Sequence, residues 1–198
     1  MAVNGEWRDL VVDSVMRPRE AARGVLGLGF PQNVILMAAV AVTCAGLVLG
    51  WVGMMMTPGA GAIDGVSAAI LGNPLLSAGA EFAGMLIVAG LTARIGRAFG
   101  GTGGFWDALT LIVWLNAILI LIQIVQIVLL AVAPPIAGMV ALAALFWAIW
   151  VFASFVAELH GFLNPMKVLG GVILTAIVLF FVLSILLAMS GLMPQGAV

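Results

Sequence analysis

Five stretches of the chain are each long enough and apolar enough to cross a lipid bilayer as an α-helix. A helix needs about 20 predominantly apolar residues to span roughly 30 Å of hydrocarbon. The stretches run over residues 33–56, 76–93, 105–133, 136–157 and 168–189. They are too long and too uniformly apolar to be barrel strands, which alternate over about ten residues. The sequence therefore predicts an all-α, polytopic membrane protein, a bundle of about five transmembrane helices.

The composition excludes an ordinary soluble domain. Apolar residues make up 65% of the 198 positions and charged residues 8%, whereas soluble domains average about 45–50% and 25%. A chain of this size leaves much of its surface uncovered after folding, so lipid has to solvate the apolar part. We expect an N-terminal segment, residues 1–32, followed by one transmembrane domain, residues 33–198, with the lipid bilayer as partner.

The basic residues indicate an orientation. Four of them precede the first stretch, two follow the second and one precedes the fifth: Arg8, Arg17, Arg19 and Arg23, then Arg94 and Arg97, then Lys167. With five crossings, all of them fall on the side of the N-terminus. Basic residues gather on the cytoplasmic side of membrane proteins. The pattern predicts a multi-pass protein of the cell inner (plasma) membrane, with a cytoplasmic N-terminus and an external C-terminus.

The N-terminal segment carries an amphipathic pattern of its own. Trp7, Leu10, Val11 and Val15 recur at helical spacing among charged residues, and Pro18 interrupts the pattern. The spacing predicts a short interfacial helix at the cytoplasmic surface, with the tryptophan at headgroup level. The alternative is a solvated or partly ordered arm. The acidic residues scattered through this segment argue against a cleaved secretory signal.

No residue pattern typical of an enzyme is present. The chain has one histidine, His160, and one cysteine, Cys44, far away in an apolar run. Ser154 lies six positions before His160, on the other side of a helix. We therefore expect His160 to be an interfacial residue, and we expect no enzymatic activity, no catalytic residue, no cofactor and no metal site. The seven basic residues are too dispersed to form a nucleic-acid patch.

Four polar residues lie inside the predicted membrane spans. They are Glu81 in the second stretch, and Asn116, Gln123 and Gln126 in the third. An ionisable side chain in hydrocarbon is costly unless it is paired, protonated or wet. These residues form either a substrate or proton pathway or a set of structural hydrogen bonds. We expect Glu81 to face the bundle interior and to hydrogen-bond to Gln126, which lies at a similar depth.

Glycines stand out at two places. Gly46 and Gly50, at helical spacing in the first stretch, leave a flat strip along which another helix can approach closely. The strip serves either packing within the bundle or self-association with a second copy of the chain. The glycine-rich run at residues 100–104 lacks the Gly-Lys-Ser/Thr ending of a nucleotide-binding loop, so it predicts a flexible turn between two membrane helices.

The middle of the chain resembles a known family. The glycine-rich turn in Ala93-Arg-Ile-Gly-Arg-Ala-Phe-Gly-Gly-Thr-Gly-Gly-Phe-Trp-Asp-Ala-Leu, the Pro134-Pro135 corner and the ending Ala157-Glu-Leu-His-Gly-Phe resemble the Yip domain family. The resemblance runs from about Trp7 to the fifth stretch. It implies a five-helix membrane domain with a cytoplasmic N-terminus.

The family is named for interaction with Rab-type GTPases and is linked in eukaryotes to vesicle trafficking. This chain looks like the short prokaryotic branch, without the long N-terminal region of those members, so GTPase binding is not carried over. The resemblance assigns no catalytic residue.

Three functions remain open from the sequence. The first is a non-enzymatic, membrane-organising or protein-interaction module of the Yip type, with other membrane proteins or a second copy as partners. The second is a small transporter or channel subunit that uses Glu81 and the amides of the third stretch. The third is an accessory subunit of a larger membrane complex.

Overall fold

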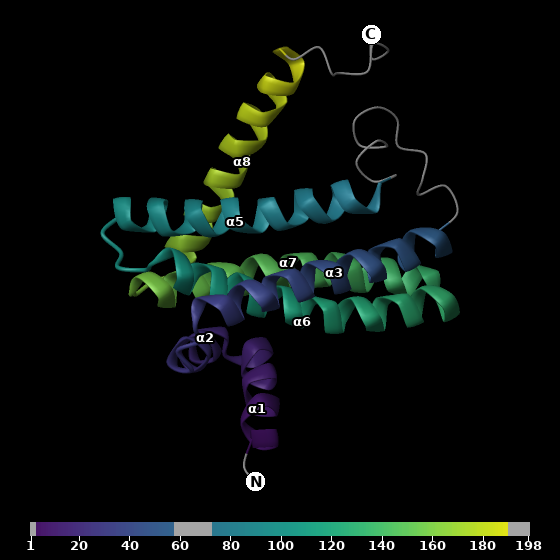
Figure 1. Cartoon of the computed structure of the whole chain (residues 1–198), viewed down its shortest axis with the longest axis horizontal. Helices are drawn as coiled ribbons and strands as arrows, with labels where there is room; N and C mark the ends of the chain where they lie inside the picture. Colours follow the sequence, from purple (N-terminus) through teal and green to yellow (C-terminus); the bar gives the residue numbers. More distant parts are fainter. Residues whose placement is uncertain (1–2, 58–72, 190–198) are drawn as a thin grey trace.

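Four long helices lie side by side and alternate in direction (Figure 1). The structure, a computed structural model, describes residues 3–57 and 73–189. The four helices are α3 (Gln32–Met56), α5 (Pro74–Ala98), α6 (Phe105–Val132) and α7 (Pro134–His160). Helix α6 contacts each of the other three. The described helices include five that are long and apolar enough to cross a membrane, so the predicted all-α membrane fold is confirmed.

Two of the helices continue beyond the apolar stretches into the more polar residues that follow. Helix α5 runs past the predicted end at residue 93 to Ala98, and α7 runs past residue 157 to His160. Hydropathy marks the end of the apolar segment and not the end of the helix, so it misses these turns.

Asparagine side chains cap the starts of α5 and α8 (Pro165–Met189). The Asn73 side chain accepts the backbone N–H groups of Leu75 and Leu76 (3.0 and 3.3 Å), and Asn164 accepts that of Met166 (2.9 Å).

Helix α8 (Pro165–Met189) departs from the direction of the other four. It starts beside the end of α7 and leaves the group at a steep angle (Figure 1). It packs against α7. Most of its described side chains are exposed, among them Phe180 and Phe181. These apolar surfaces need lipid or another protein to cover them.

The N-terminal segment forms two helices, whereas the sequence predicts one. These are α1 (Val3–Met16) and α2 (Pro18–Gly27). Pro18 does not end the helical region, because it occupies the first turn of α2, where its missing N–H is not needed. The buried residues of α2 are Pro18, Ala21, Ala22 and Val25. Three charged residues and two glycines share this short helix with them, so its mean hydropathy is low and hydropathy alone does not reveal α2.

Helix α1 is docked on the bundle and does not lie on lipid alone. The Trp7 ring lies 6.4 Å from the ring of Phe30 and 6.1 Å from that of Trp114 on α6. The indole N–H of Trp114 donates to the Ser14 hydroxyl (2.8 Å). Trp7 therefore keeps an exposed edge but has protein partners, which the headgroup-level expectation did not include.

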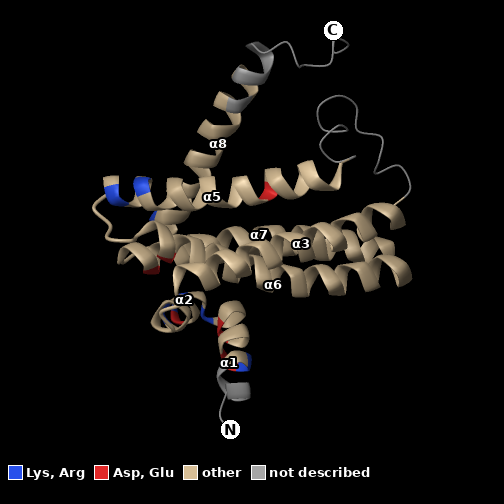
Figure 2. Cartoon of the chain, in the orientation of Figure 1, with Lys and Arg blue, Asp and Glu red and all other residues tan. Residues whose placement is uncertain are grey.

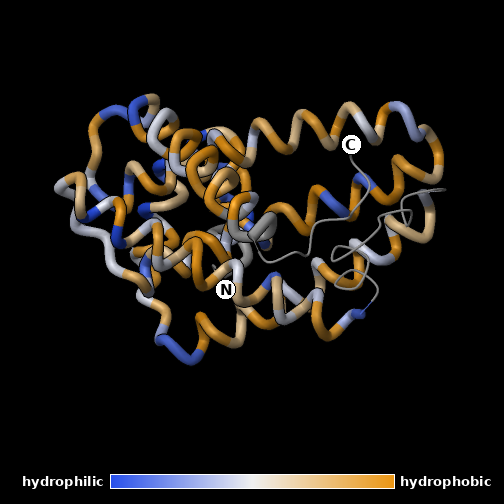
Figure 3. The backbone as a smooth tube through the Cα atoms, turned by 90° about the horizontal axis from the view of Figure 1, so that it is seen from above, coloured by the Kyte–Doolittle hydropathy of each residue, from blue (hydrophilic) through white to orange (hydrophobic). Residues whose placement is uncertain are grey.

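The tightly packed core lies toward one end of the bundle. We call this the basic end: the end where α3 and α6 begin and where α5 and α7 finish. Most fully buried residues belong to it, including Ala21, Val25, Ala93, Leu109, Val151 and Phe155. Figure 2 shows Lys and Arg on the same side, on α1 and α2 and near the end of α5. The tube coloured by hydropathy shows apolar residues dominating the long helices (Figure 3).

Helix α6 is longer than a bilayer is thick. Its 28 residues make a rod of about 42 Å at 1.5 Å per residue, against roughly 30 Å of hydrocarbon. Its buried residues lie between Ala108 and Ile118, near its start. Protein therefore covers the first turns of α6 more fully than the rest of the helix.

Candidate functional site

Glu158, near the end of α7, ties α2 to the bundle. The Arg19 Nε–H donates to Glu158 Oε2 (3.1 Å), and Arg23 Nη2 lies 2.8 Å from Oε1. Arg19 also donates to the backbone carbonyl oxygens of Phe162 (3.0 Å) and Leu163 (3.3 Å) beyond α7. The side chain of Glu158 is only 14% exposed. One carboxylate therefore holds two arginines from a helix far away in the sequence.

Replacing Glu158 with Gln should loosen α2 while leaving the transmembrane helices in place. The change removes the charge in both ion pairs and should cost about 1 kcal/mol, since each arginine is partly solvated. Hydrogen exchange of the α2 backbone should rise several-fold. The matched control is Glu20→Gln, because the Glu20 pair with Arg17 is exposed on both sides. Equal exchange of α2 in the two variants would contradict the assignment.

His160 is enclosed at the same end by backbone groups. The backbone N–H of Gly103 donates to its Nδ1 (3.1 Å), and its Nε2 lies 3.1 Å from the carbonyl oxygen of Thr92. Because Nδ1 accepts a hydrogen bond, Nε2 carries the hydrogen and donates it to Thr92. The residue is 4% exposed. The neutral imidazole thus links α7 to α5 and to the turn after α5.

Three glycines make room for the imidazole. A Cβ atom at Gly96 or Gly103 would overlap the side chains of Leu159 or His160, and one at Gly101 would lie 2.5 Å from His160 Nδ1. Such distances are too short for real Cβ contacts, so these positions need glycine. His160 lies at the end of α7, where the sequence places it, but it is buried. The histidine and the glycine-rich turn form one packed unit, the histidine cradle. The signal available in the sequence is a lone histidine in a chain with closely spaced glycines.

The cradle leaves no free nitrogen on His160. Both ring nitrogens are engaged by the backbone, so neither is available as a general base. The Ser154 hydroxyl donates to the carbonyl oxygen of Trp150 on its own helix (2.9 Å). Within residues 3–57 and 73–189, no group of three or more His, Cys, Asp or Glu side chains gathers as a metal site would require.

The four predicted intramembrane polar residues lie in three places. Asn116 donates to the carbonyl oxygen of Ile112 on its own helix (2.8 Å). Gln123 and Gln126 line a hollow of about 310 Å³ between α3, α6 and the start of α7. Glu81 borders a separate cavity between α3 and α5. Among the described residues no hydrogen bond joins Glu81 to Gln126, so that expectation is wrong: the carboxylate turns toward α3 instead.

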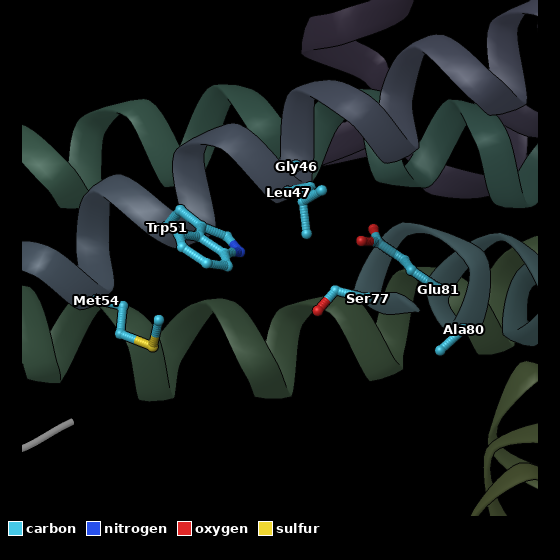
Figure 4. Close-up of a pocket in the computed structure, with 8 residues that line it drawn as sticks. Gly46, Leu47, Trp51, Met54, Ser77, Ala80 and Glu81 are labelled. Carbon is cyan, nitrogen blue, oxygen red and sulfur yellow. The ribbon is translucent and has the colours of Figure 1, made fainter. Parts of the chain in front are cut away.

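The α3–α5 cavity has a volume of about 370 Å³. The residues that line it are Gly46, Leu47, Gly50, Trp51, Met54, Ser77, Ala80 and Glu81. Figure 4 shows the Glu81 carboxylate directed at α3, with the Trp51 indole across the space and its nitrogen turned inward. Glu81 is not enclosed by protein, because the residue remains exposed at the cavity edge.

The Gly46–Gly50 strip faces neighbours within the same chain. A Cβ at Gly46 would lie 3.4 Å from Glu81 Oε1, and one at Gly50 would lie 3.8 Å from Gln123 Nε2. Both distances are ordinary van der Waals contacts. The strip therefore brings polar side chains of α5 and α6 close to the α3 backbone, which favours the interpretation as packing within the bundle.

These features define a class of protein: a helical, multi-pass membrane protein with a packed basic end and, between α3 and α5, a mostly apolar cavity that one acidic side chain borders. The family model of the Yip1 domain matches residues 12–186. The chain therefore belongs to the Yip1 domain family, as the sequence resemblance predicted. Searches of curated proteins and of solved structures give no significant match.

Proposed function

We propose that this protein is a non-enzymatic membrane-organising or protein-interaction module of the inner (plasma) membrane. Its N-terminus lies in the cytoplasm and its C-terminus outside, in agreement with the gathering of Lys and Arg at the basic end. Its partners are other integral membrane proteins or a second copy of the chain. Membership of a family of non-catalytic membrane proteins supports this proposal.

The observation that carries the proposal is the uneven packing of the helices. The basic end is closed by α2 and the histidine cradle, and most buried residues belong to it. Large apolar side chains are exposed on α8 and on the parts of α6 and α7 farthest from the basic end, including Val132, Met139, Leu142 and Phe180. Packing between membrane helices depends on such accessible faces. A rigid support that presents open helix faces suits a protein that binds other membrane helices.

The test is photo-crosslinking in living membranes. A photoreactive amino acid replaces Phe180 on α8, which is 67% exposed. The control carries it at Arg17, an exposed residue of the N-terminal segment. The proposal expects a discrete protein adduct from position 180 that survives purification in mild detergent and is absent from position 17. Adducts with lipid alone at position 180 would contradict it.

A second function, a small transporter or channel subunit, has one specific observation in its favour. The α3–α5 cavity places the carboxyl group of Glu81 beside an open space within the apolar part of the chain. Intramembrane acids next to cavities are common in ion and substrate pathways. An accessory subunit of a larger complex would yield the same crosslinks as the first proposal, and the identity of the captured protein separates those two.

A further inference from the structure

The α3–α5 cavity is chemically simple. Its lining carries one acidic group, Glu81, with a hydroxyl from Ser77 and an indole from Trp51. The remaining lining is glycine or apolar, and Leu47, Met54 and Ala80 form part of its walls. Met is flexible and adapts to differently shaped ligands. The cavity is therefore a mostly apolar space with a single site of negative charge.

Glu81 has no basic partner within the described part of the protein. The ion pairs among residues 3–57 and 73–189 use Glu20 and Glu158 as their acids. All seven Lys and Arg residues belong to α1, α2, the junction between them, the last turns of α5 or the start of α8. Glu81 is the only acidic residue in the sequence of α5. An unpaired carboxylate in hydrocarbon is costly, so a counter-charge supplied from outside the protein would be stabilised there.

Trp51 forms the wall of the cavity across from Glu81, and its indole nitrogen is turned toward the space between them (Figure 4). The edge of the ring, and not its π face, is therefore directed at Glu81. A carboxylate among apolar walls suits a lipophilic organic cation, because the walls contact its apolar groups while the carboxylate balances its charge. An anion would meet the charge of Glu81 with no basic side chain in the lining.

The size and access of the cavity fit the same class of ligand. Its volume of about 370 Å³ lies at the lower end of the roughly 300–1,000 Å³ of small-molecule sites. Glu81 remains exposed on the outside of the helix pair, which a membrane would surround with lipid. We propose that the α3–α5 cavity binds a lipophilic organic cation, with Glu81 as counter-charge and the apolar lining as the contact for its hydrocarbon groups. This site goes beyond the proposed interaction function and does not depend on it.

The test is equilibrium dialysis of the purified full chain in mild detergent with tetraphenylphosphonium. Tetraphenylborate, of the same shape and opposite charge, is the companion probe. The cation should bind saturably at one site and the anion should not. Glu81→Gln should weaken binding of the cation at least about tenfold, whereas Glu20→Gln, which removes an acid outside the cavity, should leave it unchanged.

Each outcome decides the proposal. Equal binding of the two probes, or an unchanged affinity in Glu81→Gln, would overturn it, and so would the absence of any binding. If Glu81→Gln fails to fold, Gly46→Val gives an independent test, because its side chain fills space next to Glu81 Oε1. Its matched control is Gly84→Val on α5, where a Cβ meets nothing within 4 Å. The proposal expects loss of binding in the first and retention in the second.

Discussion

Gly96→Ala should destabilise the protein by about 3 kcal/mol, although the same change inside a helix is normally favourable. The new methyl group would overlap the His160 ring. The ring cannot move aside without losing its bonds to Gly103 and Thr92, each worth about 1 kcal/mol. Thermal unfolding in detergent should show a markedly lower Tm and reduced yield of folded protein.

Two further variants isolate the cause of that loss. Gly90→Ala lies on the same helix, where a Cβ meets nothing within 4 Å, so its Tm should be unchanged or slightly raised. His160→Ala combined with Gly96→Ala removes the ring that the methyl group strikes. The double variant should therefore be no less stable than His160→Ala alone. If the two changes instead destabilise additively, a methyl group at position 96 does not clash with the His160 ring, and the assignment of the histidine cradle is wrong.

A cysteine added after the C-terminus should be labelled completely from outside intact cells, and a cysteine at position 102 not at all. The chain suits this measurement because Cys44 is its only native cysteine and can be replaced by Ala. Thr102 is exposed in the turn between α5 and α6. The expected all-or-none contrast rests on five crossings with the basic residues on the cytoplasmic side.

The same labelling decides the position of α8. Permeabilised cells provide the control, since both cysteines should then react with an impermeant maleimide. Labelling of the C-terminal cysteine only after permeabilisation would mean that α8 does not cross the bilayer. Its steep departure from the other helices (Figure 1) would then describe a helix lying along the membrane.

Apolar length is sufficient to predict the transmembrane helices. In lipid, a long apolar segment has to satisfy its backbone hydrogen bonds internally, and a helix does this without contacts to any other segment. The Pro134 corner and the Asn164 cap are equally local features, and the structure shows both at helix starts. Helix α2 is harder to predict because its alanine face contributes by close packing, which depends on the shape of α6 and α7 and leaves little trace in hydropathy.

The sites depend on contacts between distant parts of the chain. The sequence draws attention to Glu81 as a polar residue in an apolar stretch, but it suggests Gln126 on α6 as the partner. That pairing rests on depth along the membrane, and depth says nothing about rotation of each helix. Gly46 lets the Glu81 carboxylate approach α3, but the sequence indicates only that Gly46 belongs to a packing strip. Likewise, His160 and Gly103 are 57 residues apart, and nothing local connects them.

The link between α2 and Glu158 also has a consequence for biosynthesis. Arg19 and Glu158 are separated by 139 residues, which a ribosome translates in about 7–28 s. During that interval α2 lacks the α7 surface against which it packs, and the first turns of α6 are not yet covered by α7. The basic end is therefore completed late in synthesis, although α1 and α2, which pack against it, are made first. In the proposed orientation, chains that stop before the end of α7 will display these uncovered surfaces on the ribosome side of the membrane, where chaperones and proteases can recognise them.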